Sequence, residues 1–183
     1  RWVMTPAGAG KRIPLMFARV GELRKEAEVS PLNFIEPGRD RRVGFIASGP
    51  AYMHVKESFP DAPVLKLGFS CPLPFDKCRE LAAMVDQVVV VEEVEPLVET
   101  ELKAEGIAVI GKDILPLQGE LAPNVLGPAI ARLLGEEAPR LRSTPPMPLF
   151  PRPPTMCVAC PHLGVYYTLS QVRNLTISGD IGC

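Results

Sequence analysis

The chain has 183 residues, of which 46% are apolar and 22% are charged, which is enough for one compact core and a remainder. Its formal charge of −1 leaves no basic excess for a phosphate backbone, so we expect no nucleic-acid partner. The longest apolar runs are far shorter than the ~20 residues of a membrane-spanning helix, so we expect no membrane contact. Five cysteines without a secretion signal argue against a disulfide framework, so we expect a reducing, cytoplasmic compartment.

The first predicted element is an amphipathic helix over residues 14–29. Its apolar stripe consists of Met16, Val20, Leu23 and Ala27. Ser30-Pro31 is expected to end this helix. Because the chain begins Arg1-Trp2-Val3 without an initiator Met, we expect residues 1–39 to be the end of a preceding domain and a connecting helix.

From residue 43 onward, continuous apolar runs alternate with amphipathic segments. The predicted strands are 43–47, 64–69, 87–94 and 107–110. The predicted helices are a short one from Gly49-Pro50 and longer ones over 75–86, 95–105 and 123–134. Buried strands that are each followed by a helix predict an α/β domain over residues 40–137. We expect its open, mostly parallel sheet to carry helices on both faces.

The composition changes twice after this domain. Seven prolines between Pro139 and Pro154 predict a stiff, extended linker over residues 138–155. Residues 156–183 return to short apolar runs and glycine-containing turns. They are interpreted as the truncated start of a second α/β domain.

A Cys-x-x-Cys pair opens this last segment. The spacing of Cys157 and Cys160 lets one turn of backbone aim two thiolates at one metal atom, and Cys183 could supply a third. Zinc, an iron–sulfur cluster and a redox pair all use such spacing, and two packing cysteines are a further interpretation. A covalent haem is disfavoured, because Pro161 separates Cys160 from His162.

The polar residues near these cysteines have two interpretations each. His162 could donate to a phosphate or a substrate carboxylate, or transfer a proton, but a histidine satisfied by a neighbouring carbonyl is the commoner case. Gly179, Asp180 and Gly182 follow an apolar run. Their glycines would let backbone amides approach a diphosphate, although an ordinary turn also favours these residue types.

Other conspicuous residues are predicted to be structural. The acidic run Val91–Pro96 lies where a helix begins, so its carboxylates are expected to stabilise the helix dipole, with contact to a partner domain as the alternative. Cys78 lies on the buried stripe of its helix, and His54 has no chemically suggestive neighbours. Cys71 could be reactive, but a buried, inert thiol is the commoner case.

The order and spacing of seven segments resemble the alpha subunit of indolepyruvate:ferredoxin oxidoreductase, a family within the thiamine-diphosphate 2-oxoacid:ferredoxin oxidoreductases. The resemblance runs along nearly the whole chain. The matching segments are Arg1–Pro6, Gly44–Gly49, Leu73-Pro74, Val91–Pro96, Gly119–Leu121, Cys157–His162 and Ser178–Cys183.

This resemblance implies a domain layout and a reaction. Residues 40–137 would be similar to the transketolase C-terminal domain, and residues 156–183 would begin the thiamine-diphosphate-binding domain. The parent enzyme would oxidatively decarboxylate arylpyruvates such as indolepyruvate with coenzyme A and pass electrons to ferredoxin. A beta subunit would be its partner, and its cofactors would be thiamine diphosphate, magnesium and four-iron four-sulfur clusters.

The resemblance also implies roles for particular residues. Cys157, Cys160 and Cys183 would ligate a cluster, with Pro161 replacing the glycine of related enzymes. His162, Gly179, Asp180 and Gly182 would lie near the diphosphate. No catalytic residue is expected within this chain, so the fragment alone should be inactive and should bind none of these cofactors. The alternatives are a pyruvate or general 2-oxoacid oxidoreductase subunit, and a non-enzymatic α/β interaction module with a zinc knuckle at Cys157 and Cys160.

Overall fold

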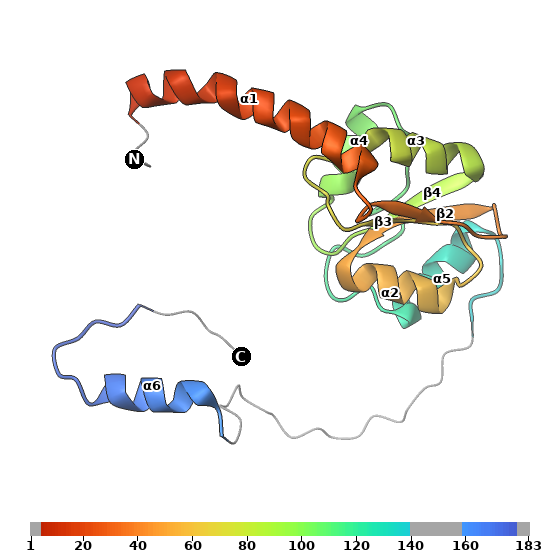
Figure 1. Ribbon diagram of the computed structural model, residues 1–183. Coiled ribbons are helices and arrows are strands. Elements are labelled where there is room, and N and C mark those ends of the chain that lie inside the picture. Colours follow the sequence, from red (N-terminus) through yellow and green to blue (C-terminus); the bar gives the residue numbers. More distant parts are fainter. Residues whose placement is uncertain (1–4, 140–158, 179–183) are drawn as a thin grey trace. The chain divides into compact units, whose positions relative to one another are not determined.

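The computed structural model describes residues 5–139 and 159–178. The chain divides into two compact units, Arg1–Leu141 (unit 1) and Arg142–Cys183 (unit 2), and each is described by itself. The helices of unit 1 are α1 (Pro6–Val29), α2 (Gly49–Ser58), α3 (Phe75–Met84), α4 (Leu97–Ala104) and α5 (Pro123–Leu133), and its strands are β1 (Phe34–Glu36), β2 (Val43–Ser48), β3 (Val64–Leu67) and β4 (Gln87–Val91). In unit 2 the structure describes one helix, α6 (Pro161–Ser170) (Figure 1).

The sheet of unit 1 has the strand order β1-β3-β2-β4 within the described residues. Strand β2 pairs in parallel with β3 on one side and with β4 on the other, whereas β1 pairs antiparallel with β3. Residues 43–47 of β2 are all buried, as expected for a central parallel strand that is covered on both faces. The predicted open, mostly parallel sheet is therefore confirmed.

Helices cover both faces of this sheet (Figure 1). Successive residues of β2 point to opposite faces, so Phe45 packs in the core beneath α2 and α5, and Ile46 packs in the core beneath α3 and α4. Each of these fully buried side chains stabilises the fold by ~1.5–3 kcal/mol. Cys78 on α3 is also fully buried, which confirms its predicted packing role.

Three elements differ from the sequence prediction. Helix α1 begins at Pro6 rather than near residue 14, with Thr5 as its N-cap. Strand β1 was not predicted, and it places residues 34–36 in the sheet. The predicted strand over 107–110 is wrong, because only Ile110 forms a bridge, with Val89 of β4. The Ile107 N–H instead donates to the Leu102 carbonyl at the end of α4, so this donor is not available for pairing with β4.

The buried side chain of Asn33 holds several segments together. Its amide nitrogen donates to the carbonyl oxygens of Ala27, at 3.0 Å, and Phe69, at 2.8 Å. Its oxygen accepts hydrogen bonds from the backbone N–H groups of Gly68, at 3.0 Å, and Phe69, at 2.8 Å. These four bonds use the full capacity of the amide nitrogen and two lone pairs of the oxygen. They join the end of α1 to the loop that follows β3.

Two side chains fasten neighbouring elements. The Glu28 carboxylate near the end of α1 accepts the N–H groups of Asp76, at 2.9 Å, and Lys77, at 3.3 Å, so α1 caps the first turn of α3. The Tyr52 hydroxyl on α2 donates to Glu36 on β1 at 2.7 Å. The hydrogen bonds from Lys56 and from Tyr52 lower the pKa of Glu36.

We predict that Asn33→Leu destabilises the chain by ~2–4 kcal/mol, because it leaves buried backbone donors and acceptors without partners. The free energy of unfolding, measured by urea titration followed by circular dichroism, checks this. Asn124→Ala, at an exposed position of α5, is the matched control and should change stability by less than about 0.5 kcal/mol. Equal stability of the two variants would show that the Asn33 amide does not hold these segments together.

Candidate functional site

A cleft lies where the loops following β2, β3 and β4 meet, at the carboxyl edge of the parallel strands. The chain leaving β2 proceeds to β3 on one side, whereas the chain after β4 returns to pair at Ile110 on the far edge of β4. Such a switch point is where open α/β sheets bind ligands. A cavity of about 430 Å³ lies there, and its lining includes Ser48, Gly49, Ser70, Cys71, Glu92 and Glu93.

Two acidic residues of this cleft, Glu92 and Glu93, accept hydrogen bonds from backbone groups. Both carboxylate oxygens of Glu92 accept hydrogen bonds from α4, from the N–H groups of Val98 and Glu99, each at 2.9 Å. This confirms the predicted stabilisation of a helix N-terminus for Glu92. Glu93 differs, because its carboxylate accepts the N–H of Leu121 at 3.0 Å and so fixes the segment that leads to α5.

The thiol of Cys71 lies in the same cleft and is exposed. The expectation that the Cys71 thiol is buried is therefore wrong. The loop between β3 and α3 carries this residue out over the carboxyl edge instead of into the core. Ser48, Gly49 and Ser70 line the cleft as well, and sequence reasoning did not single them out. Their position directly after predicted strands was the signal that could have identified them.

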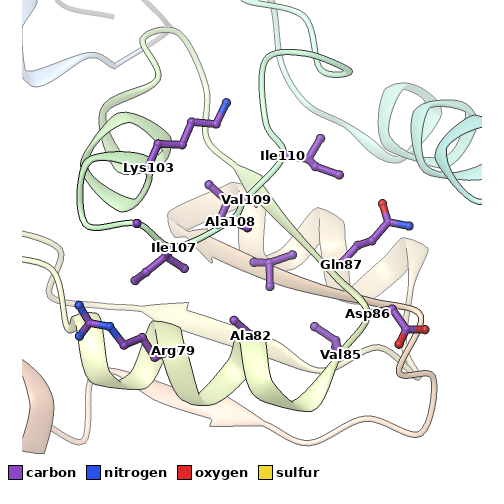
Figure 2. Close-up of a pocket in the computed structure, with 12 residues that line it drawn as sticks. Arg79, Ala82, Val85, Asp86, Gln87, Lys103, Ile107, Ala108, Val109 and Ile110 are labelled. Atoms are coloured by element: carbon purple, nitrogen blue, oxygen red, sulfur yellow. The ribbon is translucent and has the colours of Figure 1, made fainter.

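A second cavity, of about 560 Å³, lies at the other end of β4. Figure 2 shows it between α3 and the segment 106–110, with Ala82, Gln87 and Ile107 among the residues around it. Gln87 is the first residue of β4, so this cavity opens at the amino end of the parallel strands. It lies where the segment 107–110 diverges from β4. It does not occupy the edge at which α/β sheets bind ligands.

His54 on α2 has a charged neighbour. Its Nε2 lies 3.0 Å from Oε1 of Glu120, in the loop before α5. Its backbone carbonyl also accepts a hydrogen bond from Ser58. The pair joins α2 to the loop preceding α5, which is consistent with the structural role predicted for His54.

In unit 2, the described part of the Cys-x-x-Cys segment is a turn followed by α6. Ala159 has a left-handed backbone with φ of 62°, a conformation that costs a non-glycine residue ~1–2 kcal/mol. Cys160 is the N-cap of α6 and is partly exposed, and His162 lies exposed in the first turn. Other predicted site residues lie outside the described residues. They are Cys157, Gly179, Asp180, Gly182 and Cys183.

Within residues 5–139 and 159–178, no three His, Cys, Asp or Glu side chains gather as metal ligands. Of the predicted cluster ligands, the structure describes Cys160, whose soft, partly exposed thiol has the donor chemistry that iron–sulfur clusters use. The donor chemistry of Cys160 therefore fits the predicted cluster. Among the same described residues, no helix has both the length and the apolar character needed to cross a membrane.

Comparison with known proteins shows that the chain is similar in sequence to oxidoreductase subunits. No family profile matches it. It is 32% identical over its whole length to indolepyruvate oxidoreductase subunit IorA of Thermococcus kodakarensis, and it covers 31% of that protein. It is 35% identical, again over its whole length, to the protein of the same name from Methanothermobacter thermautotrophicus, of which it covers 33%. The chain thus spans about a third of the length of the curated relatives that it matches.

The fold defines the chain's first unit as an open α/β unit, and the relatives that the chain matches along its length are oxidoreductase subunits. The resemblance to the alpha subunit of indolepyruvate:ferredoxin oxidoreductase is confirmed, because six relatives named indolepyruvate oxidoreductase subunit IorA align with the chain over 99–100% of its length.

The two described cysteines of unit 1 should differ sharply in reactivity. The thiolate is the reactive form, and burial raises the pKa of Cys78 to about 12, whereas Cys71 is exposed. In a variant with Cys157, Cys160 and Cys183 changed to serine, we expect one thiol per native chain to react with Ellman's reagent. The second should react only after unfolding. Adding Cys71→Ser should abolish the native reaction, and a native reaction that persists would contradict the assignment.

Proposed function

We propose that the chain is part of the alpha subunit of an enzyme that oxidatively decarboxylates arylpyruvates, such as indolepyruvate, with coenzyme A and passes electrons to ferredoxin. The observation that carries this proposal is the match along the whole chain to relatives of one name, at 32% and 35% identity. The open, mostly parallel sheet of unit 1 supports it, because a transketolase C-terminal-like domain has this architecture. Further parts of the enzyme would be a beta subunit and the rest of the alpha subunit.

In this proposal the cofactor residues belong to unit 2. Thiamine diphosphate with magnesium would supply the electron sink for decarboxylation, and four-iron four-sulfur clusters would carry single electrons. Cys160, together with Cys157 and Cys183, would hold a cluster. The exposed imidazole of His162 would donate a hydrogen bond to the diphosphate near Gly179, Asp180 and Gly182. The left-handed turn at Ala159 supports the ligand role of Cys160, since strained backbone is found at ligand sites.

Unit 1 would have a structural role in this enzyme. The carboxylates of Glu92 and Glu93 are engaged by backbone N–H groups, so they are not free to act as general bases. In this proposal the groups that act on the substrate would lie outside the chain, and the 183 residues alone would be inactive. We further propose a cytoplasmic location, since ferredoxin-coupled clusters require a reducing compartment.

The activity is tested with the full-length alpha subunit and its beta subunit, by following ferredoxin reduction spectroscopically. We expect indolepyruvate and coenzyme A to reduce ferredoxin only when thiamine diphosphate and magnesium are present, and we expect the 183-residue chain to show no turnover. Comparing indolepyruvate with pyruvate separates the arylpyruvate enzyme from a general 2-oxoacid enzyme. Turnover that does not depend on thiamine diphosphate would refute the proposal.

Metal analysis of the same full-length protein separates the oxidoreductase from a zinc-knuckle interaction module. Iron with sulfide supports the oxidoreductase, whereas zinc alone supports the knuckle. Cys160→Ser should lower the iron and sulfide content by about one cluster per subunit. Cys71→Ser, which changes a thiol of unit 1, is the matched control and should leave the iron content unchanged.

A further inference from the structure

The outer part of α1, residues 6–24, carries an apolar stripe that nothing in the described part of unit 1 covers. Ala27, at the inner end of this stripe, is fully buried in unit 1. Farther out, the same face presents Ile13, Met16 and Leu23, which are 46%, 52% and 36% exposed. The spacing of these residues keeps them on one side of the helix. The stripe therefore continues outward from the domain core, and Figure 1 shows the helix projecting beyond the sheet and its covering helices.

This outer part is also a poor helix by itself. It contains Gly8, Gly10 and Gly21, which are unfavourable in helix interiors, and Pro14, which removes one hydrogen-bond donor within the helix. Helices with weak propensity depend on tertiary packing of their apolar face. A covering surface would supply the packing that the outer part of α1 lacks within unit 1.

The inner end of α1 is held rigidly. Glu28 caps α3, and Asn33 fastens the carbonyl of Ala27 to the loop after β3. The direction in which the outer part leaves unit 1 is thus set by the core. A helix presented in a fixed direction suits a preformed groove on its partner, because little conformational freedom is lost on docking.

We propose that the outer part of α1 docks, through its apolar stripe, into an apolar groove with an acidic rim on another domain of the same polypeptide. The curated relatives match this chain over its whole length and are about three times as long, so they contain other domains against which the helix can pack. Between residues 11 and 25 the helix carries five basic residues and one acidic residue. This positive charge would repel the same helix of a second copy. It favours a groove whose rim carries acidic residues.

This inference concerns packing between domains and holds whatever reaction the enzyme performs. Hydrogen–deuterium exchange tests it by comparing the 183-residue chain with the full-length protein. We expect the backbone amides of residues 15–24 to exchange at least about tenfold more slowly in the full-length protein, at every protein concentration. Equal exchange in both proteins would overturn the proposal. Slow exchange that appears only at concentrations where copies associate would overturn it too.

Two adjacent positions provide a matched pair of variants. Met16 lies on the stripe, whereas Leu15, 70% exposed, points to a different side of the helix. In the full-length protein, Met16→Glu should return the exchange of residues 17–24 to the rates of the 183-residue chain, and Leu15→Glu should leave it slow. Both side chains are exposed in the 183-residue chain, so unfolding of that chain by urea should be the same for both variants. Equal effects on exchange would exclude docking through the stripe.

Cross-linking identifies the occupant. A carbodiimide reagent joins Lys11 or Lys25 to nearby carboxylates, and mass spectrometry of a mixture of isotope-labelled and unlabelled protein distinguishes links within one copy from links between copies. We expect links within one copy to acidic residues outside residues 1–183. Links that predominantly join labelled to unlabelled protein would assign the surface to a second copy and overturn the proposal.

Discussion

Parallel pairing of β2 with β3 on one side and with β4 on the other is the constraint on which unit 1 depends. Because both neighbours run in the same direction as β2, each needs a crossover connection, and the helices in these connections must cover the faces of the sheet. Two separate cores result, one around Phe45 and one around Ile46. The same pairing brings the loops after three strands to one edge, which creates the cleft containing Cys71.

That edge collects helix N-termini as well, and carboxylates from elsewhere in the chain satisfy two of them. Glu28 arrives from α1 to cap α3, and Glu92 from the end of β4 caps α4. Removing such a cap typically costs about 0.5–2 kcal/mol. Glu92 and Glu93 at the cleft thus have a structural explanation, and no partner domain is needed to account for these two carboxylates. The cleft also contains the exposed thiol of Cys71.

The sequence predicted the buried strands and their helices because continuous apolar runs and 3.6-residue periodicity are local signals. It did not predict β1, whose three residues pair because Asn33 beside them is bonded to the distant Gly68 and Phe69. It predicted a strand at 107–110 because the apolar pattern of Ile107 and Val109 does not reveal that α4 takes the Ile107 N–H. The exposure of Cys71 was missed for the same reason, since a loop's path depends on contacts far away in the chain. Long-range hydrogen bonds, rather than composition, decide these details.

The described residues of unit 1 pack into cores of their own, whereas α6, which carries the candidate cofactor residues Cys160 and His162 at its N-terminus, has no buried residue. Helix α6 has no Asp, Glu, Lys or Arg, and four of its five large apolar side chains, Leu163, Val165, Tyr166 and Tyr167, are 46% or more exposed. A helix that is apolar on all sides is stable in water only when other elements surround it. In the proposed function, Cys160 and His162 at its N-terminus would acquire their working geometry from structure that surrounds α6. For this reason the proposed function rests on the match along the whole chain, and the local geometry of unit 2 only supports it.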